Sequence, residues 1–307
     1  MKWKKLGSIF TQNDSALTHS TLPFIRPSSL SSSKIEIIFS SRSLNNKSKT
    51  FSAFFDPQNN FDLRDIKSLP IITPGNLGEF DDSGSMASCI VEFNNKEYLY
   101  YIGWNLGITV PFRNSIGLCI AENNGRDFKK FSNGPILDRS FKEPHFCASS
   151  CVLKDESIIK MWYLSCVKWE IIDGKCKHFY HIKYAESKDG INWVRDGKIA
   201  IDFKDSYEYA ISTPRVIKED GIYKMWYSFR SQKNINTYRI GYAESKTGVD
   251  DWVRKDDEVG IDVSDSGWDS QMICYPSIFD HNGNRYMLYN GNDYGKTGFG
   301  IAILEKD

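Results

Sequence analysis

A chain of 307 residues with a net charge of +0 and a pI near 6.9 has no electrostatic basis for binding nucleic acid or a membrane surface, so neither is expected as a partner. It contains no run of about 18 apolar residues that would cross a bilayer, and its first residues, MKWKKLGSIFTQND, lack the apolar core of a secretory signal. Seven cysteines without paired spacing are expected to be free thiols, which favours a cytoplasmic location.

The length alone would allow two domains, but a repeat of roughly 60 residues fills nearly the whole chain and predicts one domain over residues 1–307. Each repeat contains an apolar run, Met-Trp-Tyr in its clearest form, that ends on an aromatic residue. These aromatic residues are separated by 62, 62, 64 and 62 positions: Phe39, Tyr101, Tyr163, Tyr227 and Tyr289. A small residue or proline before another apolar run recurs with a similar period: Pro23, Ser88, Ser150, Pro214 and Pro276. Short aromatic and β-branched runs at this period predict an all-β fold, a five-bladed β-propeller of four-stranded antiparallel blades.

Each blade is expected to contain four strands. The first follows the small residue or proline, as in CVLKD from Cys151, and the second is the run containing MWY. The third strands are centred on alanines that share the period: Ala53, Ala121, Ala185, Ala243 and Ala302. The fourth strands are expected to begin at aromatic residues: Phe61, Phe128, Trp193 and Trp252.

The last blade ends at Asp307, just after its third strand, so its fourth strand has to come from elsewhere. The N-terminal segment is the candidate, because Trp3 in MKWKKLGSIF is placed as Trp193 is in WVRDGKIAI. This pairing would close the ring and leave no unpaired sheet edge. The alternative is that Trp3 covers the outside of the first blade.

Acidic residues stand six to nine positions before each small residue or proline. They are Asp14, Asp82, Glu143, Glu208 and Asp269. A propeller would bring these positions toward one axis, and carboxylates that meet in a cavity have raised pKa values suited to acid and base catalysis. The alternative is that each carboxylate caps the turn before a strand. Recurrence in every unit favours the catalytic interpretation.

The loops between the second and third strands form a second set of candidates. We interpret these and two nearby residues as substrate-binding: Trp104, Arg113, His145, Trp169, Arg230, Arg239 and Asp293. Tryptophans suit stacking on a sugar ring, and arginines suit binding of a carboxylate or phosphate. Packing within the loops and surface ion pairs are the alternatives.

The motif YKMWYS…RIGYAESKTGVDDW, with IKMWYL…IKYAESKDGINW, resembles the five-bladed propeller glycosidase superfamily, which includes arabinanase/xylosidase, invertase/levansucrase and mannoside-phosphorylase clans. The resemblance covers essentially the whole chain. It implies a carbohydrate ligand and three catalytic acids, which by chain order would be Asp14, Asp82 and Glu143. Those families usually carry an Asp directly before the proline of the first strand. Here the slots hold other residues: Leu22, Ala87, Ser149, Thr213 and Tyr275.

Three functions follow from these features. The first is a glycoside hydrolase-like, carbohydrate-processing enzyme, with Glu143 or Glu208 as the acid and Asp82 as the base or nucleophile. The second is an inverting phosphorylase in which arginines hold phosphate. The third is a non-catalytic sugar-binding or accessory protein of glycan biosynthesis. No cofactor is expected, although a calcium ion in the channel is left open because calcium prefers carboxylate oxygens.

Overall fold

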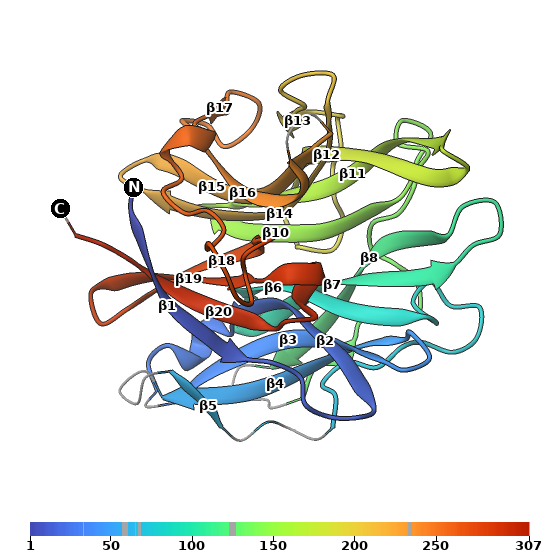
Figure 1. The fold of residues 1–307 in the computed structure, drawn as a ribbon. Coiled ribbons are helices and arrows are strands. Elements are labelled where there is room, and N and C mark those ends of the chain that lie inside the picture. Colours follow the sequence, from blue (N-terminus) through green and yellow to red (C-terminus); the bar gives the residue numbers. More distant parts are fainter. Residues whose placement is uncertain are drawn as a thin grey trace.

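The computed structural model describes residues 1–32, 34–56, 61–64, 66, 69–122, 127–232 and 235–306. Nearly all regular structure is β-strand (Figure 1). The helical segments are single turns: η1 (Pro27–Ser29), η2 (Asp256–Glu258) and α1 (Asn292–Gly295). Among the described residues, no helix has the length and apolar character needed to cross a membrane.

The described strands pair antiparallel in five groups of four. Group 1 contains β2 (Leu17–Ile25), β3 (Ile35–Ser43), β4 (Ser48–Asp56) and β5 (Asp62–Arg64). Group 2 contains β6 (Gly84–Phe93), β7 (Lys96–Leu106), β8 (Phe112–Glu122) and β9 (Lys129–Lys130). Group 3 contains β10 (Cys147–Asp155), β11 (Ile158–Ile172), β12 (Lys175–Ser187) and β13 (Ile199–Ile201).

Group 4 contains β14 (Glu208–Glu219), β15 (Ile222–Ser231), β16 (Ile235–Ser245) and β17 (Val253–Arg254). Group 5 contains β18 (Cys274–His281), β19 (Asn284–Asn290), β20 (Phe299–Leu304) and β1 (Trp3–Phe10). Single parallel bridges, Ser48 with Gly84 and Tyr180 with Ala210, join groups 1 and 2 and groups 3 and 4.

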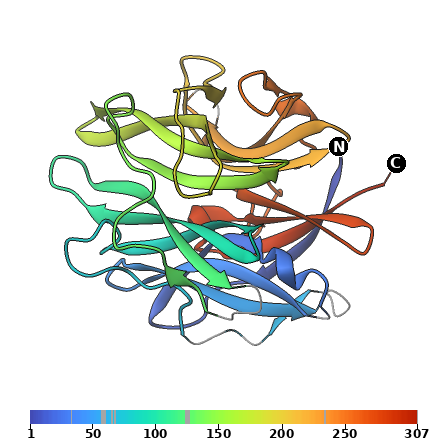
Figure 2. The ribbon, with the colours of Figure 1, turned by 180° about the vertical axis from the view of Figure 1, so that it is seen from behind.

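The N-terminal strand therefore pairs as the sequence predicts. β1 lies antiparallel to β20, with Trp3 opposite Leu304 and Phe10 opposite Phe299. Both views show this blue strand beside the red C-terminal strands (Figures 1 and 2). The Trp3 indole is buried and meets Trp226 of group 4 edge-on, with ring centroids 6.4 Å apart. The N-terminal segment thus ties group 5 to its neighbour.

The second and third strands lie where the period predicts, but the first and fourth differ. The first strands begin before the small residue or proline, as β10 does at Cys147 and β14 at Glu208. The described fourth strands of groups 1 to 4 are only two or three residues long. Trp193 makes no strand of its own, and an isolated bridge joins its neighbour Val194 to Glu186. Short outermost strands limit edge-to-edge pairing between molecules.

Five apolar clusters lie between the groups, and each draws its residues from two of them. Representative pairs are Ile38 with Leu99, Tyr100 with Met161, Trp162 with Tyr223, Trp226 with Tyr289, and Phe39 with Phe299. The second strands are buried on both faces because an apolar cluster covers each side, which explains their unbroken aromatic and β-branched runs.

The innermost strands contact one another in cyclic order: β2 with β6, β6 with β10, β10 with β14, β14 with β18, and β18 with β2. Each of them also shifts register at the small residue or proline, and β2 and β14 shift once more nearer their start. Such β-bulges re-aim side chains. Here they lie at equivalent places around a common axis.

Truncating Trp3 tests how far β1 contributes to the fold. Trp3→Ala should lower the free energy of unfolding by about 3–5 kcal/mol, because it empties a packed aromatic site. Leu6→Ala on the same strand is the control, since Leu6 is 42% exposed, and should change stability by less than about 0.5 kcal/mol. Denaturant unfolding measures both. Equal, small effects would mean that β1 pairs without stabilising the molecule.

Candidate functional site: an axial pocket rich in tyrosine and arginine

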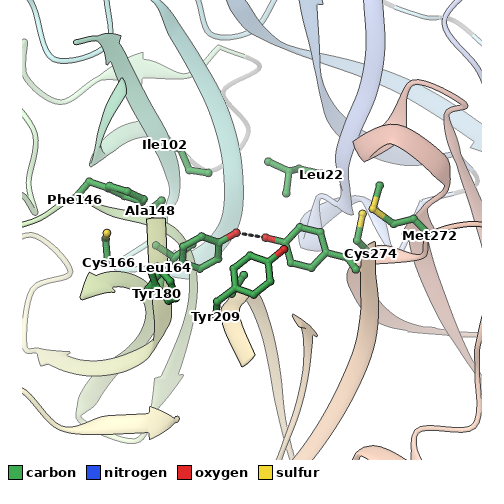
Figure 3. Packing of buried hydrophobic residues seen from close by; sticks show 13 residues of the cluster. Leu22, Ile102, Phe146, Ala148, Leu164, Cys166, Tyr180, Tyr209, Met272 and Cys274 are labelled. Carbon is green, nitrogen blue, oxygen red and sulfur yellow. Dashed lines mark hydrogen bonds between the residues drawn. The ribbon is translucent and has the colours of Figure 1, made fainter. Parts of the chain in front are cut away.

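A pocket of about 370 Å³ opens where the five groups meet. Every group contributes side chains to it, and the apolar cluster drawn in Figure 3 borders it with Leu22, Ile102, Phe146 and Tyr180. The polar lining residues are His19, Thr21, Arg42, Asn114, Ser149, His178, Tyr180, Ser212, Thr213, Arg230, Tyr238, Tyr275 and Tyr294. None of the described residues that line it is an Asp or a Glu.

The bulges of the innermost strands supply part of the pocket wall. Leu22, Thr213 and Tyr275 each precede a proline and have φ values of 56°, 51° and 56°. These left-handed conformations cost about 1–3 kcal/mol each in non-glycine residues, and such strain gathers at functional sites. Each backbone N–H is held by a side chain: that of Leu22 by Asn290, that of Thr213 by Ser149 and that of Tyr275 by Ser228.

Arg230 on β15 carries the most extensive set of contacts in the pocket. Its guanidinium donates to Tyr294 at 2.8 Å and to Tyr180 at 3.3 Å. It also lies over the rings of Tyr209 and Tyr238, at 4.9 and 4.7 Å from the ring centroids. The Nε–H of Arg230 has no partner among the described protein atoms. Tyrosines thus orient the cation without neutralising it, and a donor is left for a ligand.

Two histidines border the pocket as neutral rings. Burial, with Arg230 and Lys177 nearby, lowers the pKa of His178 to about 4. Its ring stacks on Tyr180 with centroids 5.1 Å apart. Burial and Arg42 lower the pKa of His19, and the nearby charge of Asp293 opposes that shift. The fixed charge of the pocket at neutral pH therefore comes from its arginines.

The carboxylates predicted as catalytic lie outside this pocket. Three are buried and bonded to partners in their own group: Glu143 accepts from Tyr163 and Ser165, Glu208 binds Arg254 through two oxygens, and Asp269 accepts from Lys5 and Tyr289. In group 2, the neighbour Asp81, and not Asp82, takes this place and bonds Tyr101 and Lys130. Asp82 accepts from Gly78 and Ser83, and exposed Asp14 accepts from Ala16.

This arrangement gives a structural cause for the recurrence of acids. In groups 2 and 5 the acid accepts both from the tyrosine of the second strand and from a lysine two residues after the aromatic of the fourth strand. In group 3 Glu143 accepts from Tyr163, and in group 4 Glu208 binds Arg254, which lies two residues after Trp252. In group 5 the base is Lys5 of β1. Group 1 has Phe39 in place of tyrosine, and its Asp14 is correspondingly exposed. The expected convergence on the axis is absent because each buried carboxylate is bonded within its own group.

The predicted binding residues divide in the same way. Arg230 lines the pocket, and Asp293 is exposed beside Tyr294, which also lines it. Trp169 packs behind the wall against His178, with centroids 4.9 Å apart. The remaining candidates do not line it: Trp104 is buried and donates to Ser48, Arg239 pairs with Asp262, Arg113 is exposed and His145 is partly exposed.

Several lining residues were not selected from the sequence as site residues, among them Tyr180, Tyr238, Tyr275 and Tyr294. Tyrosines also recur in the buried strands, so the sequence does not distinguish a tyrosine that lines the pocket from one that packs in the core. A signal did exist: the slots before the proline or small residue include Leu22, Ser149, Thr213 and Tyr275, and all four line the pocket.

The buried carboxylates should be essential for stability. Glu208→Gln leaves Arg254 without its bidentate partner and should lower the free energy of unfolding by at least about 2 kcal/mol. Asp14→Asn, an exposed acid with one backbone contact, is the control and should stay within about 0.5 kcal/mol. Thermal and denaturant unfolding give the answer. A Glu208→Gln protein of unchanged stability that had lost turnover would instead support catalysis by Glu208.

The lowered pKa of His178 predicts a pH effect with a definite sign. In the unfolded chain the imidazole titrates near its ordinary value of 6.5, so between about pH 6.5 and 4 the unfolded state binds more protons. Stability should therefore fall as the pH falls through this range, and His178→Gln should make the decline shallower. The melting temperature followed against pH tests this. His281→Gln, outside the pocket, should leave the wild-type slope unchanged.

Comparison with known proteins places the chain in a family. No protein-family model matches the sequence. An uncharacterized protein of Mycobacterium tuberculosis, Rv1502, is 38% identical over 308 residues, covering 99% of this chain and all of that protein. A 1,2-beta-oligomannan phosphorylase of Thermoanaerobacter sp. is 39% identical over 80 residues, covering 26% of this chain and 27% of the enzyme.

Solved structures resemble the fold over nearly its full length. A glycoside hydrolase superposes with a TM-score of 0.74 at 17% identity, covering 97% of this chain and 90% of its own. A second structure superposes with a TM-score of 0.72 at 14% identity, covering 99% of this chain and 93% of its own. Its description states that the GH130 family of mannoside phosphorylases contains glycoside hydrolases that target beta-1,2 mannosidic linkages in Candida mannan. The chain therefore shares its fold with these solved structures, and it belongs to one family with Rv1502 of Mycobacterium tuberculosis.

Proposed function

We propose that the chain is a carbohydrate-processing enzyme that acts in the axial pocket, and that phosphorolysis of a glycoside is the reaction this pocket supports best. The observation that carries the proposal is the lining: two arginines, two histidines and four tyrosines, with no carboxylate among the described lining residues. Hydrolysis by the usual mechanism needs two carboxylates beside the sugar. Phosphorolysis needs a site for phosphate and one proton donor.

The two arginines are suitably placed for a phosphate. Arg42 lies on β3 of group 1 and Arg230 on β15 of group 4, and these groups are not neighbours in the cyclic order of innermost strands. The two side chains therefore enter the pocket from different sides. Guanidinium groups bind phosphate oxygens through charge-assisted hydrogen bonds. The tyrosine rings and hydroxyls offer stacking surface and hydrogen bonds to a saccharide.

The reaction would exchange one bond at the anomeric carbon. A phosphate oxygen attacks that carbon, the bond to the leaving sugar oxygen breaks, and that oxygen takes up a proton, giving a sugar 1-phosphate and a shortened saccharide. We assign the proton donor to Asp293, whose exposed carboxyl is adjacent in the chain to the lining residue Tyr294. The two similarities that name mannoside phosphorylases support the same class of reaction.

Two further elements of the sequence analysis enter as proposals. First, the five groups would be the blades of a five-bladed propeller, and β1 would close its ring. The cyclic contacts of the innermost strands and the five clusters between groups support this proposal. A cytoplasmic location would supply inorganic phosphate. Catalysis by Asp82, Glu143, Glu208 and Asp269 stays a prediction, and it would require the three buried acids to leave their present partners.

A second candidate function is non-catalytic binding of an anionic saccharide. The described lining residues include no carboxylate, which favours this function too. Binding without product over a long incubation would separate it from the enzyme. Calorimetry with a sugar phosphate supplies the binding measurement.

Phosphate dependence tests the main proposal. With a β-1,2-linked oligomannoside and inorganic phosphate, sugar 1-phosphate should form, and it should not form without phosphate. Arg230→Met should raise the KM for phosphate at least about tenfold, equivalent to about 1.4 kcal/mol, because a charge-assisted bond is lost. Arg239→Met, whose arginine pairs with Asp262 outside the pocket, is the control. Sugar release at the same rate without phosphate would show a hydrolase instead.

A further inference from the structure

Arg215 is a buried arginine on the axis, below the pocket. It lies on β14 two residues after Thr213 of the pocket wall, which is about 7 Å further along the strand. Only 8% of it is exposed. Its equivalents in the other innermost strands are Phe24, Cys89, Cys151 and Ser277, as their pairing with the second strands shows.

These five residues form a layer around the axis. The guanidinium of Arg215 lies over the ring of Phe24, 5.6 Å from its centroid. β14 contacts β10 and β18, whereas β2 contacts β6 and β18, so this contact crosses the axis. The backbone N–H of Val216 bonds the thiol of Cys151. Arg215 therefore projects into the centre of the layer.

No carboxylate balances the charge of Arg215 within the described part of the chain. Other well-buried arginines have such partners: Arg254 binds Glu208 and Asp256, and Arg26 binds Glu36 and Glu97. Arg215 instead makes two long contacts, at 3.4 and 3.5 Å, to the carbonyls of Ser150 and Pro214.

Unused hydrogen-bond donors occur on Arg215 and on residues that precede two other members of the layer. The Nε–H of Arg215 and the hydroxyls of Ser88 and Ser150 have no partner among the described protein atoms. The neighbouring thiols do not supply negative charge, since burial raises the pKa of Cys89 to about 12 and also raises that of Cys151. Burying an unpaired charge with unmet donors is costly unless a counter-ion accompanies it.

We propose that Arg215 binds a small inorganic monoanion of halide size, such as chloride, in this axial layer. The ion would accept from Nε of Arg215 and balance its charge, with the hydroxyls of Ser88 and Ser150 as further donors. Every residue of the layer is at most 8% exposed, so the ion would be enclosed, and a single-atom anion needs less space there than an oxoanion does. The charge of Arg215 opposes a divalent cation at the same level of the axis. This site is independent of the proposed reaction.

Replacing gluconate by chloride at constant ionic strength tests the proposal. An ion that binds only the folded state should raise the melting temperature by about 2 °C for each tenfold increase above its Kd, for a chain of this length. Arg215→Met should abolish this dependence. Arg285→Met should keep it, because Arg285 is paired with Glu219 and Asp280 elsewhere. Stabilisation by sulfate but not by chloride would overturn the assignment to a halide.

Bromide diffraction provides a test that needs no variant, in case Arg215→Met does not fold. Crystals grown in bromide should show an anomalous peak at hydrogen-bonding distance from Nε of Arg215. No peak there, together with a melting temperature indifferent to chloride, would mean that water alone solvates the guanidinium. A chloride dependence that survives in Arg215→Met but is lost in Arg230→Met would place the ion in the pocket and overturn the proposal.

Discussion

Each group of strands has to pack against two neighbours at once, and the rest of the structure depends on this constraint. It requires second strands that are buried on both faces, such as Ile35–Phe39. It also brings β2, β6, β10, β14 and β18 into cyclic contact. Because the innermost strands share one axis, equivalent residues in distant parts of the chain become neighbours. The pocket and the layer around Arg215 are two levels of that axis.

The same constraint explains the buried polar bonds within the groups. Tyr163 and Tyr289 donate to carboxylates that precede their innermost strands. From the outer strands, Lys5 donates to Asp269, which Tyr289 also bonds, and Arg254 binds Glu208. These bonds link the outer and inner parts of a group through otherwise apolar surroundings. Carboxylates used in this way are satisfied by fixed partners, whereas a catalytic carboxylate has to meet a substrate. The recurrence of these acids along the chain therefore indicates stabilisation of each group more strongly than it indicates catalysis.

The electrostatic character of the axis is local and positive within a chain of zero net charge. Arg42, Arg230 and Arg215 lie along it without a carboxylate ion pair among the described residues, while the neutral histidines add hydrogen-bonding groups but no fixed charge. Tyrosine hydroxyls and ring faces hold Arg230 without cancelling its charge. An anionic ligand is the natural complement of such a pocket.

The sequence by itself determined the repeat, the second and third strands of each group, and the pairing of the N-terminal segment with β20, because apolar periodicity and turn residues are local properties of the chain. Of the residues it proposed for substrate binding, Arg230 lines the pocket. The lining residues Leu22, Ser149, Thr213 and Tyr275 stand at recurring positions to which the sequence assigned no binding role. Only the tertiary structure decided which of these face the axis. The direction of a side chain such as Glu208 or Tyr238 depends on a bulge and on a partner far along the chain, such as Arg254 or Tyr180, and no local pattern encodes that choice.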